Sequence, residues 1–331
     1  MVALAETTDV FLITGFLGSG KTTLLNRLIK DFPRDKKLMV LMNEFGEIGI
    51  DGSLLVGDDY DLLEISKGSI FCVCVKTDFI KALYRLGSEV KPDALLIEST
   101  GVANPTDLKR DLKLPIFNNR FVFREQICLV DAAHFLDAFG VFSSVEDQIA
   151  TSTVFVINKM DLAGPERVQA IKDVIRSHHP DPMFYETSYG AIDSSRLLKW
   201  SDTTGMAQEV GITMTDEELE QYIDKLLEDP GASLKPPELL ISATFKWEGD
   251  VLKEIDELGT ALPGAVPRVK GFVLHAEDTY LLDYVMGQYG LQKVSPNPGK
   301  FAANVLVVIA PPTLMAEVED IMRQHHCFRT Q

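Results

Sequence analysis

The chain of 331 residues is long for one domain and suits two, because domains commonly contain about 150 residues. Its apolar fraction of 46% and charged fraction of 24% are typical of a globular protein and exclude a disordered chain. The formal net charge of −17, with no run of Lys or Arg, disfavours nucleic acid and anionic membranes as partners, because like charges repel.

Residues 1–8 lack the basic region and apolar core of a targeting signal, and the apolar run that follows is too short to cross a membrane. The sequence therefore predicts a cytoplasmic protein. The four cysteines, at positions 72, 74, 128 and 327, do not form the framework of a secreted protein. In a reducing compartment the close pair, Cys72 and Cys74, favours a metal or redox site.

The first patterned stretch reads as strand, phosphate-binding loop and helix. An apolar run over 10–14 precedes a glycine-rich loop, and apolar residues at helical spacing follow up to residue 29. Backbone N–H groups at a helix N-terminus bind anions, and glycines leave space for phosphate oxygens. The alternative is a glycine-rich turn before an ordinary helix, but the flanking strand and helix are those of a P-loop. The residues predicted to bind nucleotide here are Gly15, Gly18, Ser19, Gly20, Lys21, Thr22 and Thr23.

A second buried strand is predicted over 38–42, followed by a polar loop, 43–51, with three carboxylates and two glycines. Ligands of open α/β sheets bind at the carboxyl ends of strands, so this loop is placed to sense a γ-phosphate. The alternative is a solvated surface loop. A short strand over 62–65 and an amphipathic helix over about 77–86 come next.

An acid and a glycine follow the next apolar strand, 94–97. Glu98 ends this strand and Gly101 lies three residues further on. In P-loop proteins that hydrolyse phosphates, the acid at such a strand end holds Mg²⁺ and the glycine amide faces the γ-phosphate. We therefore expect Glu98 and Thr22 to hold Mg²⁺, and Gly101 and Lys21 to act on the terminal phosphates. A capped turn is the alternative.

A nucleobase-binding signature follows the strand predicted over 153–157. The residues Asn158, Lys159 and Asp161 have the spacing Asn-Lys-x-Asp. The Asp161 carboxylate can accept from N1–H and the exocyclic amine of guanine, and Asn158 can meet guanine O6, whereas adenine does not offer this pair of donors. Thr187 is predicted to lie in a second base-contacting loop. The sequence therefore predicts specificity for GTP and GDP.

The elements between these motifs complete an alternating pattern. A strand is predicted over 126–131, in which Cys128 reads as a small buried apolar residue. Helices over 145–150 and 166–177, and a strand over 183–186, continue the alternation. Strands that alternate with helices indicate a doubly wound, mostly parallel α/β sheet.

The alternation stops near residue 200, which predicts a domain of residues 1–200. Residues 201–237 read as a linker with an acidic helix over 216–228. Residues 238–331 read as a small α+β domain with helices on one face of its sheet. Its predicted elements are strands over 239–247, 270–275, 280–294 (one or two strands) and 303–309, and helices over 251–258 and 314–325.

Taken together, these residues resemble the CobW-type metallochaperone GTPases, relatives of the nickel-insertion GTPases of hydrogenase and urease. The resemblance covers almost the whole chain. It rests on Gly15 to Thr23, Asn43 to Glu47 with Gly49 and Asp51, Glu98 to Gly101, Val130 to Ala132, Asp147 to Ala150, Asn158 to Asp161, and the small C-terminal domain. It implies a protein that binds and slowly hydrolyses GTP with Mg²⁺, and that carries or inserts a transition metal or helps to activate a metal or corrinoid enzyme.

The metal motif of that family, Gly-Cys-x-Cys-Cys, is incomplete here, where the matching stretch is 68–74. Cys72 and Cys74 with Glu47 of the polar loop would supply three ligands to Zn²⁺ or Co²⁺, and water or a partner protein the fourth. Loss of metal binding is the alternative. The tail 325–327, His-His-Cys, offers a further soft site or, as we expect, an exposed helix end.

The resemblance implies a client metalloenzyme or corrinoid protein as partner, and it leaves the metal, the client and the oligomeric state open, a homodimer included. Two other functions stay open. A GTP-dependent activator that carries no metal would keep the nucleotide motifs and dispense with the cysteines, as Ser69 and Val73 in the incomplete motif suggest. A small-molecule kinase would use the same P-loop without the Asn-Lys-x-Asp signature.

Overall fold

The computed structural model describes the chain except for several short segments. The described residues are 4–5, 7–43, 61–65, 73–99, 108–139, 142–179, 181–199, 207–208, 215–227, 241–249, 251–275, 278–294 and 304–330. They form two compact units, which are described one at a time.

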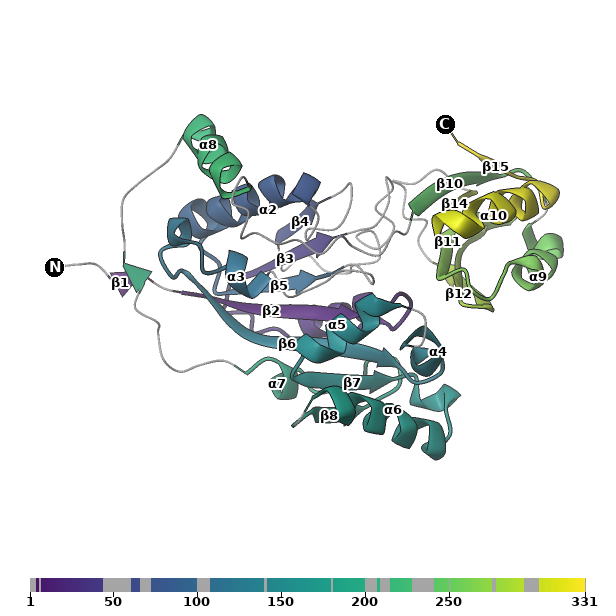
Figure 1. Ribbon diagram of the computed structural model, residues 1–331, viewed down its shortest axis with the longest axis horizontal. Coiled ribbons are helices and arrows are strands. Elements are labelled where there is room, and N and C mark those ends of the chain that lie inside the picture. The colour runs from purple at the N-terminus through teal and green to yellow at the C-terminus, as the bar shows by residue number, and fades with distance from the viewer. Residues whose placement is uncertain are drawn as a thin grey trace. The chain divides into compact units, whose positions relative to one another are not determined.

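The first unit contains a seven-stranded sheet in which all neighbouring strands are parallel (Figure 1). Its strands, in spatial order, are β4 (Asp61–Ile65), β3 (Leu38–Asn43), β5 (Ala94–Glu98), β2 (Thr8–Gly15), β6 (Phe121–Asp131), β7 (Val154–Asn158) and β8 (Met183–Glu186). This sheet confirms the predicted fold class. Strand β2 lies between two halves that are wound in opposite directions, which is where open α/β sheets place their ligands.

Helices lie between the strands of this sheet in the chain, and two more follow its last strand, β8. They are α1 (Lys21–Lys30), α2 (Val73–Arg85), α3 (Leu108–Asp111), α4 (Phe135–Phe139), α5 (Ser143–Thr151), α6 (Pro165–His178), α7 (Ser194–Leu197) and α8 (Asp216–Leu227). A π-helical turn, Leu86–Val90, extends α2, and 3-10 turns occur at Pro115–Phe117 and Met160–Leu162. Two short antiparallel strands, β1 (Leu4–Ala5) and β9 (Ala207–Gln208), pair outside the main sheet.

Each face of the sheet has its own apolar core. On one face, Leu12 and Leu41 pack with Phe79 of α2 and Ile223 of α8. On the other face, the alternate strand residues pack with α1, for example Ile13 with the helix residues at 24, 25 and 28. Because the central strands are buried on both faces, they read in the sequence as continuous apolar runs, which explains their correct prediction.

The structure corrects the predicted start of the helix after β4. The sequence pattern placed that start at Thr77, but α2 begins at Val73, so the backbone of Cys74 lies in its first turn and not in a loop. The segment contains no Pro or Gly, and an established helix extends readily through such residues. The acidic helix of the predicted linker is α8, which packs on α2 and pairs Glu220 with Lys81.

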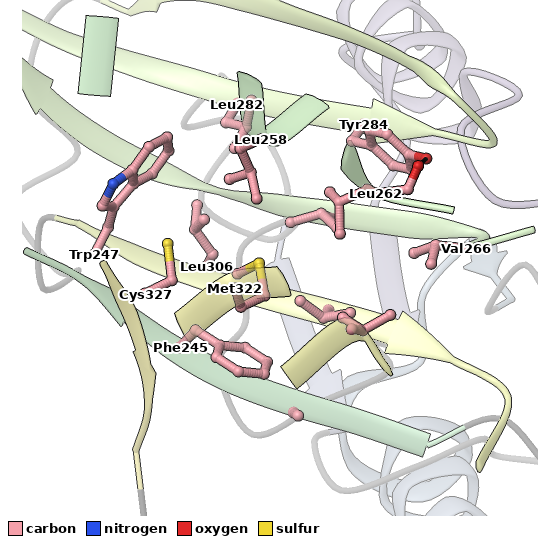
Figure 2. Packing of buried hydrophobic residues seen from close by; sticks show 14 of the residues in the cluster. Phe245, Trp247, Leu258, Leu262, Val266, Leu282, Tyr284, Leu306, Met322 and Cys327 are labelled. Carbon is pink, nitrogen blue, oxygen red and sulfur yellow. Dashed lines mark hydrogen bonds between the residues drawn. The ribbon is translucent and has the colours of Figure 1, made fainter. Parts of the chain in front are cut away.

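The second unit is an antiparallel sheet with two helices, which confirms the predicted α+β architecture. In spatial order its strands are β13 (Gln288–Val294), β12 (Asp278–Val285), β11 (Arg268–His275), β14 (Val305–Ala310), β10 (Ile241–Trp247) and β15 (Cys327–Arg329). The helices are α9 (Val251–Ala261) and α10 (Pro312–Gln324). Both contribute side chains to one core with the sheet, including Leu258 of α9 and Met322 of α10 (Figure 2).

The end of this unit differs from the sequence expectation of an exposed helix end. Helix α10 ends at Gln324, and Cys327 enters β15, where it lies opposite Trp247 in the core (Figure 2). Cys327 is 1% exposed, and burial raises the pKa of its thiol to about 12. The thiol is therefore neutral at physiological pH and packs as a small apolar group. Among the described helices, none is both long and apolar enough to span a membrane.

Candidate functional site

The carboxyl ends of the parallel strands meet at one edge of the sheet. The register places Ile13 of β2 beside Glu98 of β5, and Asp131 of β6 beside Asn158 of β7. Motifs that are far apart in the sequence therefore lie at the ends of neighbouring strands. This edge is where a doubly wound sheet binds its ligand.

The glycine-rich loop between β2 and α1 adopts backbone conformations that only glycine accepts readily. Gly15, Gly18 and Gly20 have φ values of 134°, 75° and 102°. A Cβ atom on Gly15 would lie 2.3 Å from the carbonyl oxygen of Leu129, which is backbone and does not move aside. The sequence pattern therefore reflects a steric requirement of the loop as well as space for a ligand.

Lys21 opens helix α1 and folds over this loop. Its Nζ donates to the carbonyl oxygens of Gly15 at 2.9 Å and Phe16 at 3.1 Å, and the residue is 6% exposed. The ammonium group therefore lies against the start of the loop, and the end of the loop leads into the N-terminus of α1. A cation and a helix N-terminus at the same place form a site for an anion such as phosphate. Thr23, in the same turn, is exposed.

Thr22 and Glu98 provide neighbouring oxygen atoms on α1 and β5. The Thr22 hydroxyl donates to Glu98 Oε1 at 3.1 Å, and Glu98 is 4% exposed. A hydroxyl and a carboxylate are hard oxygen ligands of the kind that Mg²⁺ prefers. These two residues therefore fit a Mg²⁺ ion beside the phosphate-binding loop.

Asn158 joins the glycine-rich loop to the loop that follows β8. Its Nδ2 donates to the carbonyl oxygen of Ser19 at 2.9 Å, and its Oδ1 accepts from the N–H of Gly190 at 3.0 Å. The residue is 2% exposed. The Asn158 Nδ2 group has a second hydrogen and Oδ1 has a second lone pair, so these bonds do not prevent a further hydrogen bond to guanine. The contact between Asn158 and guanine O6 stays a prediction. The structural role of Asn158 as a bridge was not predicted from the sequence.

The remaining residues of the base-binding signature lie on two adjacent loops. Asp161 is exposed, and its backbone N–H donates to Ser188 Oγ at 3.2 Å. The N–H of Met160 donates to the carbonyl oxygen of Thr187 at 3.2 Å, and Thr187 is 7% exposed. Hydrogen bonds within the protein therefore hold the loop that contains Asp161 against the loop that contains Thr187.

Asp131, at the end of β6, is a charged centre of this edge. Its Oδ2 accepts from Lys159 Nζ at 2.7 Å and lies 3.1 Å from His134 Nδ1. Burial alone would raise the pKa of Asp131, but the hydrogen bond from His134 and the positive charge of Lys159 lower it below its ordinary value. Asp131 is therefore a carboxylate at neutral pH.

A small, largely apolar cavity lies behind the glycine-rich loop. It has room for about one water molecule, and the residues that line it include Phe16, Leu17, Cys128 and His134. Burial raises the pKa of the Cys128 thiol to about 12, which agrees with the predicted role of Cys128 as a small buried apolar residue.

Several predicted site residues cannot be placed. Gly101, Glu47 and Cys72 lie outside the described residues, and only the backbone of Cys74 is described. Within the described part of the chain, no group of three His, Cys, Asp or Glu side chains is arranged to hold a metal ion. The roles of these four residues therefore stay predictions.

The sequence reading did not assign functional roles to Asp131, His134 and Gly190, which the structure brings into the site. Asp131 had a signal of its own, because it ends a buried strand in the same way as Glu98. Gly190 contributes through a contact to Asn158, 32 residues earlier, for which the sequence spacing gives no signal. His134 contacts Asp131 within one turn, and a single His three residues after a strand end is too common a pattern to predict this role.

Comparisons with known proteins give one family and several relatives. The family model described as "CobW/HypB/UreG, nucleotide-binding domain" matches residues 9–186. The zinc chaperone YeiR of Escherichia coli K12 is 36% identical over 189 residues, which cover 56% of this chain and 57% of that protein. The chain thus spans little more than half the length of YeiR.

Two further similarities extend over more of the chain. The zinc-regulated GTPase metalloprotein activator 1 of Dictyostelium discoideum is 24% identical over 346 aligned positions, covering 91% of this chain and 70% of that protein. Among solved structures, the Zn(II)-bound YjiA GTPase from E. coli is 20% identical with a TM-score of 0.44, covering 96% of this chain and 99% of that one.

Proposed function

Because the chain belongs to the CobW/HypB/UreG family, whose model matches residues 9–186, we propose that it binds and slowly hydrolyses GTP and delivers a transition metal to a client protein. One observation carries the nucleotide part. The Asn158 amide ties the glycine-rich loop, through Ser19, to the loop after β8, through Gly190. A phosphate-binding loop and a base-binding loop are thereby held as one surface.

The phosphate end of the proposed site uses position and charge. The loop amides and Lys21 hold the phosphates, and Thr22 with Glu98 would hold Mg²⁺, which neutralises charge on the phosphate oxygens when bound. In the sequence, no residue stands out as the group that positions the attacking water. We therefore expect a low intrinsic rate that a partner or the metal raises.

The base end of the proposed site selects guanine. The carboxylate of Asp161 accepts two hydrogen bonds from the guanine edge, while Lys159 lies between it and Asn158 in the sequence. Adenine would leave the carboxylate unpaired, and this unpaired carboxylate is the physical source of the specificity. The kinase alternative does not require this pair of contacts.

The cargo proposed for this protein is a zinc- or cobalt-type ion bound by Cys72, Cys74 and Glu47. Its support is the presence of two soft thiolates close together in the sequence, and the similarity of the chain to YeiR, a zinc chaperone. The alternative is an activator without its own metal. The incomplete motif and the helical backbone of Cys74 favour that alternative.

Guanine preference is the first test. In a Mg²⁺ buffer we expect GTP and GDP to bind at least about a hundredfold more tightly than ATP, because a site built to pair a polar edge rejects a base without it. Isothermal titration with GTP, GDP and ATP measures this ratio. Equal affinity for GTP and ATP would overturn the proposed function.

Metal stoichiometry is the second test. We expect about one Zn²⁺ per chain in the wild type and none in Cys72→Ala/Cys74→Ala, because the thiolates are the strongest ligands. Cys327→Ala is the matched control, since that thiol is buried and neutral. A wild type that hydrolyses GTP and binds no Zn²⁺ in its GTP or GDP state would support the activator. Zn²⁺ affinity that is equal in the two states would refute delivery driven by hydrolysis.

A further inference from the structure

The Asp131 carboxylate receives donors from three directions. Oδ2 accepts from Lys159 Nζ at 2.7 Å and from His134 Nδ1 at 3.1 Å, and Oδ1 accepts from the N–H of Ala133 at 2.9 Å. The side chain of Asp131 is 5% exposed and that of His134 is 10% exposed. The carboxylate is therefore fixed in position before it meets the lysine.

The turn after β6 that contains His134 is itself held rigidly. Arg167 of α6 donates to the carbonyl oxygens of Ala132 at 3.2 Å and Ala133 at 2.6 Å. The N–H of Ala132 donates to the carbonyl oxygen of Asn158 at 3.0 Å. This turn is thus joined directly to the start of the base-binding signature, one residue before Lys159.

Lys159 needs such support. Its backbone has a φ of 61°, a left-handed conformation that side chains other than glycine seldom adopt. The Lys159 side chain is 27% exposed and has four rotatable bonds, so in solvent it would sample many conformations. The ion pair with Asp131 selects one of these conformations and holds the ammonium group at the end of β6.

We propose that Asp131 and His134 are positioning residues for nucleobase binding: Asp131 fixes the Lys159 side chain as a preformed wall against the guanine ring, and His134 fixes Asp131. The inference rests on the proposed GTP site and adds to it the residues that preorganise its base end. Because the Lys159 side chain is already ordered before the nucleotide binds, binding does not carry the entropic cost of ordering it. The affinity for the nucleotide therefore rises without any added contact to the phosphates.

His134 acts through Asp131 because the described structure gives its ring no other hydrogen bond. Its Nε2 is buried and has no hydrogen-bond partner among the described residues, and the ring lines the cavity behind Phe16 and Leu17. The His134 ring can therefore influence the base site through its hydrogen bond to Asp131. The effect of changing His134 should therefore have the same form as that of changing Asp131, and be smaller.

A double-mutant cycle tests this mechanism. We expect Asp131→Asn to weaken GTP and GDP equally, by about tenfold, as the loss of a charged hydrogen bond that orders its partner would. In the Lys159→Met background, the same Asp131→Asn change should cost nothing further, because its target is gone. The KM for GTP should rise while kcat stays unchanged.

Inorganic tripolyphosphate separates positioning of the base wall from general damage. It probes the phosphate end alone, so its affinity should be the same in the wild type and in Asp131→Asn. His134→Phe should weaken GTP about threefold, and His134→Gln, which can still donate to Asp131, should restore most of the affinity. Asp173→Asn, an exposed carboxylate paired with Arg176 on α6, is the matched control and should bind GTP as the wild type does.

Three results would overturn the inference while leaving the GTP site standing: unchanged GTP affinity in Asp131→Asn, additive losses with Lys159→Met, or an equal loss of tripolyphosphate affinity. If Asp131→Asn does not fold, the double-mutant cycle of His134→Phe with Lys159→Met replaces it. Additive losses of GTP affinity in that cycle would overturn the inference. A wild type without guanine preference would overturn the proposed function and this inference together.

Discussion

Asp161→Asn is expected to change the nucleotide preference from GTP to xanthosine triphosphate. The variant loses two hydrogen bonds from guanine to a charged carboxylate, worth about 3 to 6 kcal/mol together, or roughly 10²- to 10⁴-fold in affinity. Xanthine replaces the exocyclic amine of guanine by a carbonyl group. The amide of the variant can accept from xanthine N1–H and donate to this carbonyl, so xanthosine triphosphate should gain what GTP loses.

Competition titrations with GTP, xanthosine triphosphate and ATP measure this exchange. Asp161 is exposed, so the substitution should leave the free energy of unfolding within about 0.5 kcal/mol of the wild-type value. Asp173→Asn makes the same chemical change on α6 and should keep the preference for GTP. If Asp161→Asn binds GTP as tightly as the wild type, Asp161 does not contact the base.

Gly20→Ala is expected to lower GTP affinity by at least about a hundredfold. A Cβ atom on Gly20 would lie 2.5 Å from Asn158 Nδ2, and the residue has a φ of 102°. The strain of that φ in alanine costs about 1–3 kcal/mol, and each hydrogen bond that Asn158 gives up adds about 1 kcal/mol. The glycine-rich loop then loses both its shape and its connection to the loop after β8.

Substitutions at two other glycines, Gly15 and Gly164, serve as comparisons for Gly20→Ala. Gly15→Ala meets the backbone oxygen of Leu129 at 2.3 Å, so we expect a large loss of stability as well as of binding. Gly164→Ala meets nothing within 4 Å and should leave both unchanged. Urea unfolding followed alongside GTP titration separates the three variants. Wild-type GTP affinity in Gly20→Ala would show that the bridge through Asn158 is not needed for binding.

The sequence predicted the parallel sheet well because its strands are buried on both faces. The predicted range 94–97 differs from β5 (Ala94–Glu98) by one residue at its end, and the predicted range 153–157 differs from β7 (Val154–Asn158) by one residue at each end. A strand covered by helices on both sides must be apolar throughout, and this pattern is visible without any knowledge of neighbours. The loops at the ends of these strands were predicted by the residue types that phosphate and guanine require.

What the sequence did not predict depends on contacts between distant segments. Strand β15 has only three residues, and its pairing with β10 decides its conformation, so local preference indicated a helix end instead. The bridge through Asn158 and the ion pair between Asp131 and Lys159 likewise arise from the approach of separate segments. Spacing along the chain identifies a side chain that can bind a ligand, but not a side chain that holds another in place.

The amide of Asn158 has a consequence for how the protein is made. It lies 139 residues after Ser19, whose carbonyl oxygen it binds, and 32 residues before Gly190, which binds it in turn. During synthesis on the ribosome, the glycine-rich loop can therefore form this bridge only after β7 and the segment after β8 have left the exit tunnel. A nascent chain that has not yet reached Gly190 would have the complete sequence of the glycine-rich loop without its bridge to the loop after β8, so nucleotide can stabilise only the nearly complete nucleotide-binding unit.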